Sequence, residues 1–460
     1  MDTTKPLIEL ELDDDGRIRR TGNVLTASTH IITVVVGAGV LALAWAMAQL
    51  GWIAGIGSII TFSSISIFTY SLVADCYRYP DPVTGNRNYT YMQAVKAYLG
   101  GTMHVACGLV QYTKLAGITV GYTITSSTSL VAIRKAICFH NKGNAASCKF
   151  SNNPFMIGFG ILQIFLSQIP NFHELTWLST AAAITSFGYV FIGSGLCLSV
   201  ILSGKGAATS ITGTKLPLED KLLKVFTAMG NIALACTYAT VIYDIMDTLK
   251  SHPAENKQMR RANVLGVTAM TILFLLCSGL GYAAFGDNTP GNILTGFTEP
   301  FWLVALGNGC IIIHMIGAYQ VMGQPFFRIV EMGANMVWPH SDFINKEYPF
   351  MIGSVMVRFN LFRLVWRTIF VILATILAMI MPFFSEVLSL LGAIGFGPLV
   401  VFFPIQMHIA QKQIRKLSLR WCCLQFLSCL GFVISLAAVV GSIHGIILDF
   451  YKTNLFMYKQ

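Results

Sequence analysis

Charged residues are scarce in this sequence. Asp, Glu, Lys and Arg together make up 11% of the 460 residues, while hydrophobic residues make up 54%. A soluble globular protein carries about 25% charged residues. With a mean hydropathy of +0.64, the composition excludes an ordinary soluble protein. It predicts an all-α polytopic membrane protein, because helices satisfy their own backbone groups in lipid.

Common enzyme motifs are also missing. The sequence contains no Walker-type phosphate loop, no H-E-x-x-H and no G-x-S-x-G. Without a phosphate loop, a pump driven by ATP is disfavoured, and transport coupled to an ion remains as the energy source. We therefore expect no enzymatic activity, no cofactor and no bound metal.

Long apolar runs, in contrast, are abundant. A transmembrane helix needs about 20 such residues. The runs predict eleven spans, at residues 24–50, 52–74, 102–133, 154–170, 176–202, 222–247, 263–285, 301–327, 366–383, 387–410 and 421–448. Lys and Arg are about twice as frequent in the loops on one side, which marks that side as cytosolic. The N-terminus is then cytosolic and the C-terminus extracellular.

The basic loops also explain the formal net charge of +10, because they lie against the anionic lipid bilayer. No nucleic-acid partner is needed. Residues 1–23 are polar and acidic and predict a disordered cytosolic tail. Asp244 and Asp247, at the cytosolic end of the sixth span, are expected to meet Arg260 or Arg261.

The spans divide into two halves of five. Residues 24–202 hold spans one to five, and residues 203–410 hold spans six to ten. Residues 411–460 add an eleventh span and an external C-terminus. Since the first half begins inside and the second outside, the halves are related by inversion, as in secondary transporters.

Each half opens on a span interrupted by glycine. Gly37-Ala38-Gly39 lies within the first span, and Gly230-Asn231 lies within the sixth. Unpaired backbone at mid-membrane depth is costly unless it lines a cavity or binds something. The matched pair predicts broken helices at a substrate site, whereas the alternative is that the glycines serve only close helix packing.

The two interruptions together suit a zwitterion. Backbone N–H groups around Gly37, Ala38, Gly39 and Val40 would open a half-helix whose positive end binds a carboxylate. Carbonyl groups around Gly230, Asn231 and Ala233 would bind an ammonium group. The substrate class predicted is therefore amino acids.

Lys114 is the one basic residue deep within a span. A lysine there costs about 2.5–3.5 kcal/mol on insertion scales, so it must face protein or water. It is predicted to be a fixed cation in the coupling site or a group that releases its proton; the alternative is a packing lysine. His30 and His314 are further candidates for moving protons, and the alternative for each is a buried neutral histidine.

Eleven cysteines are present, and only Cys138 and Cys148 share a loop. The predicted topology puts this loop outside the cell, where disulfides form. We expect a Cys138–Cys148 disulfide; the alternative is two free thiols.

Several motifs resemble those of the plant amino acid permeases, in the amino acid/auxin permease family. They begin with Thr21-Gly-Asn-Val-Leu-Thr-Ala-Ser-Thr-His and continue through Asp75-Cys-Tyr-Arg-Tyr-Pro-Asp-Pro, Ser167-Gln-Ile-Pro-Asn-Phe-His, Gly281-Tyr-Ala-Ala-Phe-Gly-Asp-Asn, Gly317-Ala-Tyr-Gln-Val and Phe362-Arg-Leu-Val-Trp-Arg-Thr. The resemblance implies a plasma-membrane symporter of protons and neutral or acidic amino acids. It also implies eleven spans in the LeuT-type 5+5 inverted-repeat fold.

The sequence departs from the family pattern at three positions. Asn231 and Gln406 stand where that pattern has carboxylates, and Gly397 stands where it has an aromatic residue. The carboxylates missing at positions 231 and 406 are groups that could carry a proton, so their loss is expected to affect proton coupling. The alternatives are a related carrier of auxin, GABA, lysine or histidine, or a substrate-binding sensor with weak or no transport.

Overall fold

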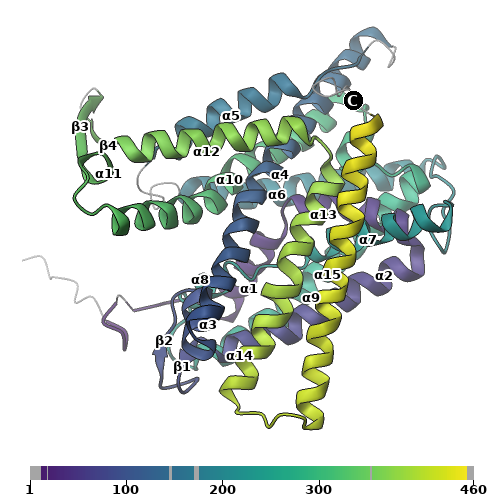
Figure 1. Ribbon diagram of the computed structural model, residues 1–460. Helices are drawn as coiled ribbons and strands as arrows, with labels where there is room; N and C mark the ends of the chain where they lie inside the picture. Colours follow the sequence, from purple (N-terminus) through teal and green to yellow (C-terminus); the bar gives the residue numbers. More distant parts are fainter. Residues whose placement is uncertain (1–11, 18, 144–147, 170–175, 353–354, 453–460) are drawn as a thin grey trace, which may run out of the picture.

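The computed structural model describes residues 12–17, 19–143, 148–169, 176–352 and 355–452, and these form a bundle of helices (Figure 1). The helices are α1 Val24–Val35, α2 Ala38–Asp75, α3 Tyr91–Leu99, α4 Gly101–Lys142, α5 Asn153–Ser167, α6 Thr176–Leu202, α7 Leu218–Ala235, α8 Ile242–Met246, α9 Glu255–Phe285, α10 Phe301–Val337, α11 Asp342–Asn345, α12 Leu361–Ile380, α13 Phe384–Gly395, α14 Phe403–Gln411 and α15 Leu419–Lys452. The short helical turns η3 Gly286–Asn288 and η4 Ile293–Gly296 and the π-helix η5 Phe396–Phe402 join them.

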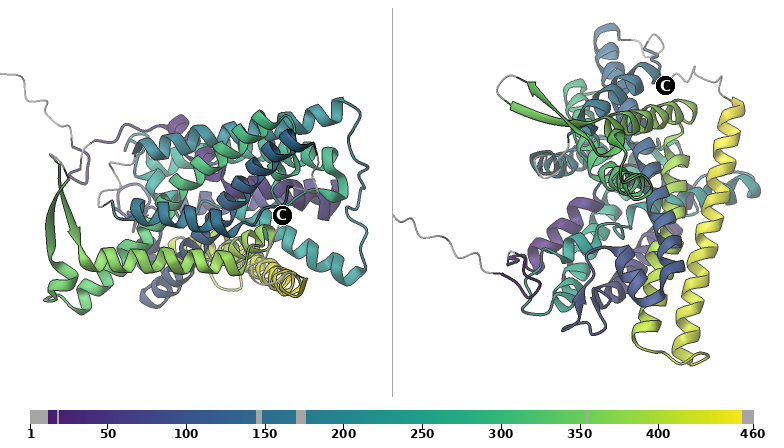
Figure 2. Two further views of the ribbon diagram at one scale, coloured as in Figure 1. Left: turned by 90° about the horizontal axis from the view of Figure 1, so that it is seen from above. Right: turned by 60° about the vertical axis from the view of Figure 1, so that its left-hand side comes forward.

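Two small antiparallel strand pairs lie outside the bundle. Strand β1 Arg78–Tyr79 pairs with β2 Asn86–Arg87, and β3 Glu347–Ile352 pairs with β4 Val355–Asn360. Hairpin β1–β2 lies beside the N-terminal segment, whereas hairpin β3–β4 lies at one end of α12 (Figures 1 and 2). Most of the remaining secondary structure in the described ranges is helical, as the composition predicts.

Eight helices of the described ranges are long and apolar enough to cross a bilayer. Two more, Val24–Val35 and Asn153–Ser167, are apolar but shorter. Helix α2 contains one residue with non-helical geometry, Gly51, at φ 79°. This corner lies between the predicted spans 24–50 and 52–74. Glycine fits there because φ is positive and the backbone of residues 211–213 lies directly against it.

The bundle packs around α2, α4 and α7. Helix α2 contacts α9 and α7, and α4 contacts α10. Helices α13 and α15 lie side by side (Figure 1), and both contact α7. This arrangement puts the ends of α1, α2 and α7 in the middle of the molecule.

Helix α7 corrects the predicted position of the second interruption. It continues through Gly230 and Asn231 and ends only at Ala235. Gly230 instead serves close packing, since a Cβ there would lie 2.6 Å from the carbonyl oxygen of Ser389 on α13. Gly392 on α13 faces the Gly230 carbonyl in return. Close packing, the alternative interpretation of the glycines, therefore applies to Gly230.

The tail predicted over residues 1–23 is described only in part, because residues 1–11 and 18 lie outside the described ranges. Residues 12–17 and 19–23 lie against the body of the protein. The Gly22 N–H donates to the Thr248 carbonyl at 2.9 Å, and the Lys250 N–H donates to the Gly22 carbonyl at 3.1 Å. These partners lie more than 200 positions along the chain, so local composition does not reveal them.

The predicted disulfide between Cys138 and Cys148 is confirmed, with Cα atoms 5.8 Å apart. By the loop-entropy model, closing a loop of this length stabilises the fold by about 3 kcal/mol at most. We expect mass spectrometry of the non-reduced protein to find these cysteines in one linked peptide pair. Cys148→Ser should lower the free energy of unfolding by up to that amount. Alkylation of both thiols before reduction would contradict the bond.

Candidate functional site

Two gaps between helices face one cavity at the centre of the bundle. The first gap, Val36–Gly37, separates α1 from α2, and the second, residues 236–241, separates α7 from α8. The space bordered by its lining residues is about 610 Å³, open solvent at its mouth included. It is lined by residues of both gaps and of α4, α10 and α13: Val34, Val35, Gly37, Ala38, Gly39, Lys114, Leu115, Ile118, Tyr122, Leu234, Thr237, Tyr238, Thr240, Met322 and Leu388.

The first gap ends in a helix N-terminus. Gly37 has extended geometry and precedes the first helical residue of α2, Ala38. The N–H groups of Ala38 and Gly39 therefore have no carbonyl one turn earlier to bind. The Tyr189 hydroxyl donates to the Val36 carbonyl at 3.4 Å, which steadies the gap. The positive end of the α2 dipole thus faces the cavity.

The second gap is held open by hydroxyl groups of α2. Ser66 donates to the Cys236 carbonyl at 2.9 Å, and the Tyr70 hydroxyl accepts from the Tyr238 N–H at 2.9 Å. The Tyr70 and Tyr238 rings pack with centroids 4.1 Å apart. These bonds replace some of the helical hydrogen bonds that the chain gives up here, which lowers the cost of the gap within an apolar bundle.

Lys114 reaches the cavity from α4. Its side chain is buried, at 4% exposure, and its Nζ donates to the Thr237 hydroxyl at 3.4 Å. A Cβ at Gly395, on α13, would lie 3.1 Å from Nζ, so this glycine makes room for the ammonium group. Within the described ranges no carboxylate forms an ion pair with Lys114. The predicted basic residue therefore lies between the second gap and α13.

The other predicted residues are distributed around the cavity. Val40 lines a smaller neighbouring cavity with Tyr189 and Ile293. Gly230 and Ala233 are buried on α7. His30 is exposed on α1, away from the cavity-lining residues.

Asn231 is fully buried on α7, one turn before Leu234, which lines the cavity. Neither polar atom of its amide has a hydrogen-bond partner within the described part of the chain. Leaving a buried amide without a hydrogen-bond partner costs free energy. This cost indicates that Asn231 has a role other than packing.

His314 faces the first gap. Its Nδ1 lies 2.8 Å from the Ala182 carbonyl, and a Cβ at Gly37 would lie 3.6 Å from its Nε2. The ring is 6% exposed. It is thus a buried, hydrogen-bonded histidine, as the alternative interpretation of the sequence expected.

Several residues of the cavity are not predicted from the sequence. Thr237, Tyr238 and Thr240 come from the second gap itself, and Tyr122 and Met322 come from α4 and α10. The signal for the first three is the polar run Cys236-Thr-Tyr-Ala-Thr240 inside an apolar stretch. For the aromatic and thioether side chains no local signal exists, since they resemble any other apolar residue of a span.

Known transporters resemble the chain over almost its whole length. Residues 20–448 match the family model described as "Transmembrane amino acid transporter protein". Amino acid permease 8 of Arabidopsis thaliana is 52% identical, over 95% of this chain and 93% of that protein. Amino acid permease 1 of the same plant is 53% identical, over 95% and 91%. The solved inward-facing conformation of Mhp1 aligns with a TM-score of 0.56 at 11% identity, over 95% and 94% of the two chains, a similarity of fold.

Proposed function

The chain belongs to the transmembrane amino acid transporter family, and from this premise we propose that it imports neutral and acidic amino acids across the plasma membrane together with protons. The protein is a permease rather than an enzyme. The observation that carries the proposal is the single cavity lined by both gaps, Val36–Gly37 and residues 236–241.

The substrate's charged groups fit the two helix ends that meet at this cavity. The carboxylate binds at the N–H groups of Ala38 and Gly39, where the α2 dipole is positive. The ammonium group binds at the carbonyl end of α7, where the dipole is negative. This site replaces the position first expected, around Gly230, by the helix end at Ala235.

The substrate's side chain faces an apolar wall. Ile118, Tyr122, Met322 and Leu388 line the cavity on the side of α4, α10 and α13. Lys114 is the one charged group among the lining residues. A neutral or acidic side chain is compatible with this wall, whereas a cationic one would meet like charge without a carboxylate to offset it.

The proposed topology is the LeuT-type fold with eleven spans. Residues 24–202 and 203–410 form the two inverted repeats, and residues 411–460 contribute the eleventh span and an extracellular C-terminus. The N-terminus is cytosolic. Two observations support this division. Each gap lies in the opening segment of its half. The similarity of fold to Mhp1 is consistent with it.

Lys114, Asn231 and His30 are the proposed coupling residues. Lys114 supplies a fixed positive charge where other carriers bind a cation, while Asn231 is an amide in the position of a carboxylate. An amide donates and accepts hydrogen bonds but does not exchange a proton in the physiological range. This favours, as a second candidate function, a protein that binds amino acids and accumulates them only weakly.

Asn231→Asp tests the proton coupling. We expect the native protein to take up amino acids with a shallow dependence on external pH, and the variant to gain steeper stimulation by acid, because a carboxyl can carry a proton. The measurement is uptake of a panel of labelled amino acids into vesicles across a range of external pH, at matched expression.

The matched control is Asn288→Asp, which adds the same carboxyl at an exposed position in η3. It should leave the pH profile unchanged. Steep acid stimulation of the native protein with no change in Asn231→Asp would assign coupling to another residue. No uptake of any amino acid by any of these proteins would argue for the sensor.

A further inference from the structure

Exposed thiols gather near the beginning of α15. Cys422, Cys423 and Cys429 have exposed side chains, and all three lie in this helix. Within a helix bundle a free cysteine usually serves as a small apolar residue of the core. That explanation fits the buried free cysteines, which are Cys76, Cys107, Cys197, Cys236 and Cys277. It does not fit the exposed thiols of α15, and none of the cavity-lining residues belongs to that helix.

Cys422 and Cys423 lie where α15 enters the membrane. Arg420 and Trp421 directly precede them, and residues 421–448 contain no Asp, Glu, Lys or Arg. At 1.5 Å per residue such a run is about 40 Å long, whereas the hydrocarbon core of a bilayer is about 30 Å thick. The ends of the run therefore lie among the lipid headgroups, where tryptophan is enriched. Cys429, about two helical turns further on, lies within the hydrocarbon.

The loop that joins α14 to α15 carries a cluster of positive charge at the free end of the hairpin formed by these helices (Figure 1). Lys412, Arg415, Lys416 and Arg420 are exposed, and no carboxylate of the described ranges forms an ion pair with them. Arg420 instead donates to the Nε2 of His408, on α14, at 2.9 Å. The charge of the loop is thus available to a partner outside the chain.

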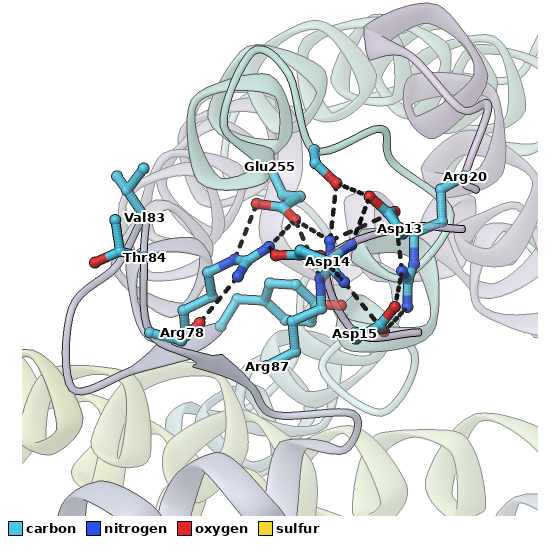
Figure 3. A network of polar contacts seen from close by, with 12 residues as sticks. Asp13, Asp14, Asp15, Arg20, Arg78, Val83, Thr84, Arg87 and Glu255 are labelled. Carbon is cyan, nitrogen blue, oxygen red and sulfur yellow. Dashed lines mark hydrogen bonds and ion pairs between the residues drawn. The ribbon is translucent and has the colours of Figure 1, made fainter. Parts of the chain in front are cut away.

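Arginines elsewhere at this end of the bundle are paired within the protein. Arg78 and Arg87 bind aspartates of the N-terminal segment (Figure 3). Asp247 meets Arg20 rather than the expected Arg260. The α14–α15 loop differs in keeping its charge, and basic segments next to a membrane span are attracted to the anionic lipids of the cytosolic leaflet. This attraction would hold the start of α15 at the lipid surface.

Cys422 begins an apolar stripe on the face of α15 that is turned away from the bundle. The next members, at spacings of four and three residues, are Phe426, Cys429 and Val433, and all are exposed. Phe426 is 70% and Val433 is 63% exposed, whereas Ser428, on the opposite face, is 3% exposed. The exposed face of such a span lies against lipid. A hydrocarbon chain attached to the Cys422 sulfur would therefore lie along this stripe in the leaflet.

We propose that Cys422 and Cys423 are sites of S-acylation by long-chain fatty acyl groups, whereas Cys429 is not. Cysteines beside a membrane span are typical targets of reversible S-acylation, because the thiol and the acyl donor meet at the membrane surface. Cys429 lies too deep for this meeting. The inference rests on the proposed topology, in which the α14–α15 loop is cytosolic.

The reaction needs a thiol and an activated acyl group, and the donor is a long-chain acyl thioester of coenzyme A. The cysteine sulfur attacks the acyl carbonyl carbon, and a new carbon–sulfur bond forms as the bond to the coenzyme A sulfur breaks. Coenzyme A leaves as a thiol that carries the proton lost by the cysteine. One thioester replaces another, so neither an oxidant nor a reductant is required.

The test is capture of thioesters from the full-length protein, produced in plant cells. Free thiols are blocked with maleimide in denaturant, thioesters are cleaved with neutral hydroxylamine, and the released thiols are captured on a resin. We expect capture of the native protein that depends on hydroxylamine, and loss of nearly all of it in C422S/C423S. The Cys138–Cys148 disulfide is not cleaved by hydroxylamine and gives no signal. Growth with an alkyne-bearing palmitate should label the native protein and not the double variant.

Cys429→Ser is the matched control, because it removes an exposed thiol of the same helix at greater depth in the bilayer. It should be captured as strongly as the native protein. Absence of hydroxylamine-dependent capture from the native protein, or an equal loss in Cys429→Ser and C422S/C423S, would overturn the proposal. Protection of Cys422 and Cys423 that a reducing agent removes and hydroxylamine does not would also overturn it, since that result identifies a disulfide.

Serine fits these exposed positions, so we expect both variants to be recovered at the native level. Capture does not depend on movement of a substrate, and uptake is measured separately on the same proteins. A native protein that is captured but takes up no amino acid keeps the acylation sites and refutes the proposed transport. One that takes up amino acids without hydroxylamine-dependent capture supports the transport and refutes the acylation.

Discussion

Gly39→Val is expected to abolish amino acid uptake while the protein still reaches the membrane. Gly39 is the second residue of α2 and lies where the two gaps meet. A Cβ there would lie 3.0 Å from the Ala235 Cα and 3.2 Å from its nitrogen. These are backbone atoms, so they cannot move aside as a flexible side chain would. Overpacking of this kind costs about 1–3 kcal/mol, which corresponds to roughly 5–150-fold in an equilibrium constant.

The measurement is uptake and substrate binding at equal surface expression. Gly57 provides the matched control, because it lies in the same helix, is exposed, and would place a Cβ with nothing within 4 Å. Gly57→Val should transport like the native protein. Unchanged uptake in Gly39→Val would refute the placement of the substrate at the end of α2.

The long helices are predictable because bilayer spans are set by local apolar length. The corner at Gly51 is predictable in the same way, because it lies where one apolar run of span length ends and the next begins. The first interruption is also close to its prediction, since α2 begins at Ala38. Glycine pairs mark weak points in a helix.

The second interruption is not predictable from glycine alone. Gly230 lies in continuous helix because α13 packs directly against it, a contact between residues about 160 positions apart. The gap opens instead at 236–241, where Ser66 and Tyr70 of α2 bind the freed backbone. Whether a glycine opens a helix or packs it thus depends on side chains of other helices.

The acidic tail shows the same limit. Asp13, Asp14 and Asp15 form a short charge run, which alone predicts a solvated, disordered segment. Arg20, one of their partners, lies five to seven positions away, but the other two, Arg78 and Arg87, lie more than 60 positions away. The local sequence therefore gives the charge of the segment but not the surface that binds it.

Replacing Lys114 with methionine is expected to abolish uptake or to make it dependent on sodium. Methionine keeps most of the length of the side chain and removes the charge. The Lys114 ammonium donates to Thr237 in the second gap, beside Gly395 of α13. If it supplies the positive charge that other carriers take from a bound cation, the native protein needs no sodium, and the variant either fails or recruits the ion.

Uptake into vesicles with sodium or choline as the outside cation decides between these outcomes. Lys142→Met is the matched control, because Lys142 lies in the same helix, α4, but is exposed at its end, and its removal should change neither uptake nor sodium dependence. Lys114→Arg separates charge from shape, since guanidinium keeps the charge but is planar and larger. Uptake that is retained in Lys114→Arg and lost in Lys114→Met assigns the role to the charge. Normal, sodium-independent uptake in Lys114→Met would leave Lys114 as a packing residue, and His30 would be the next candidate for moving protons.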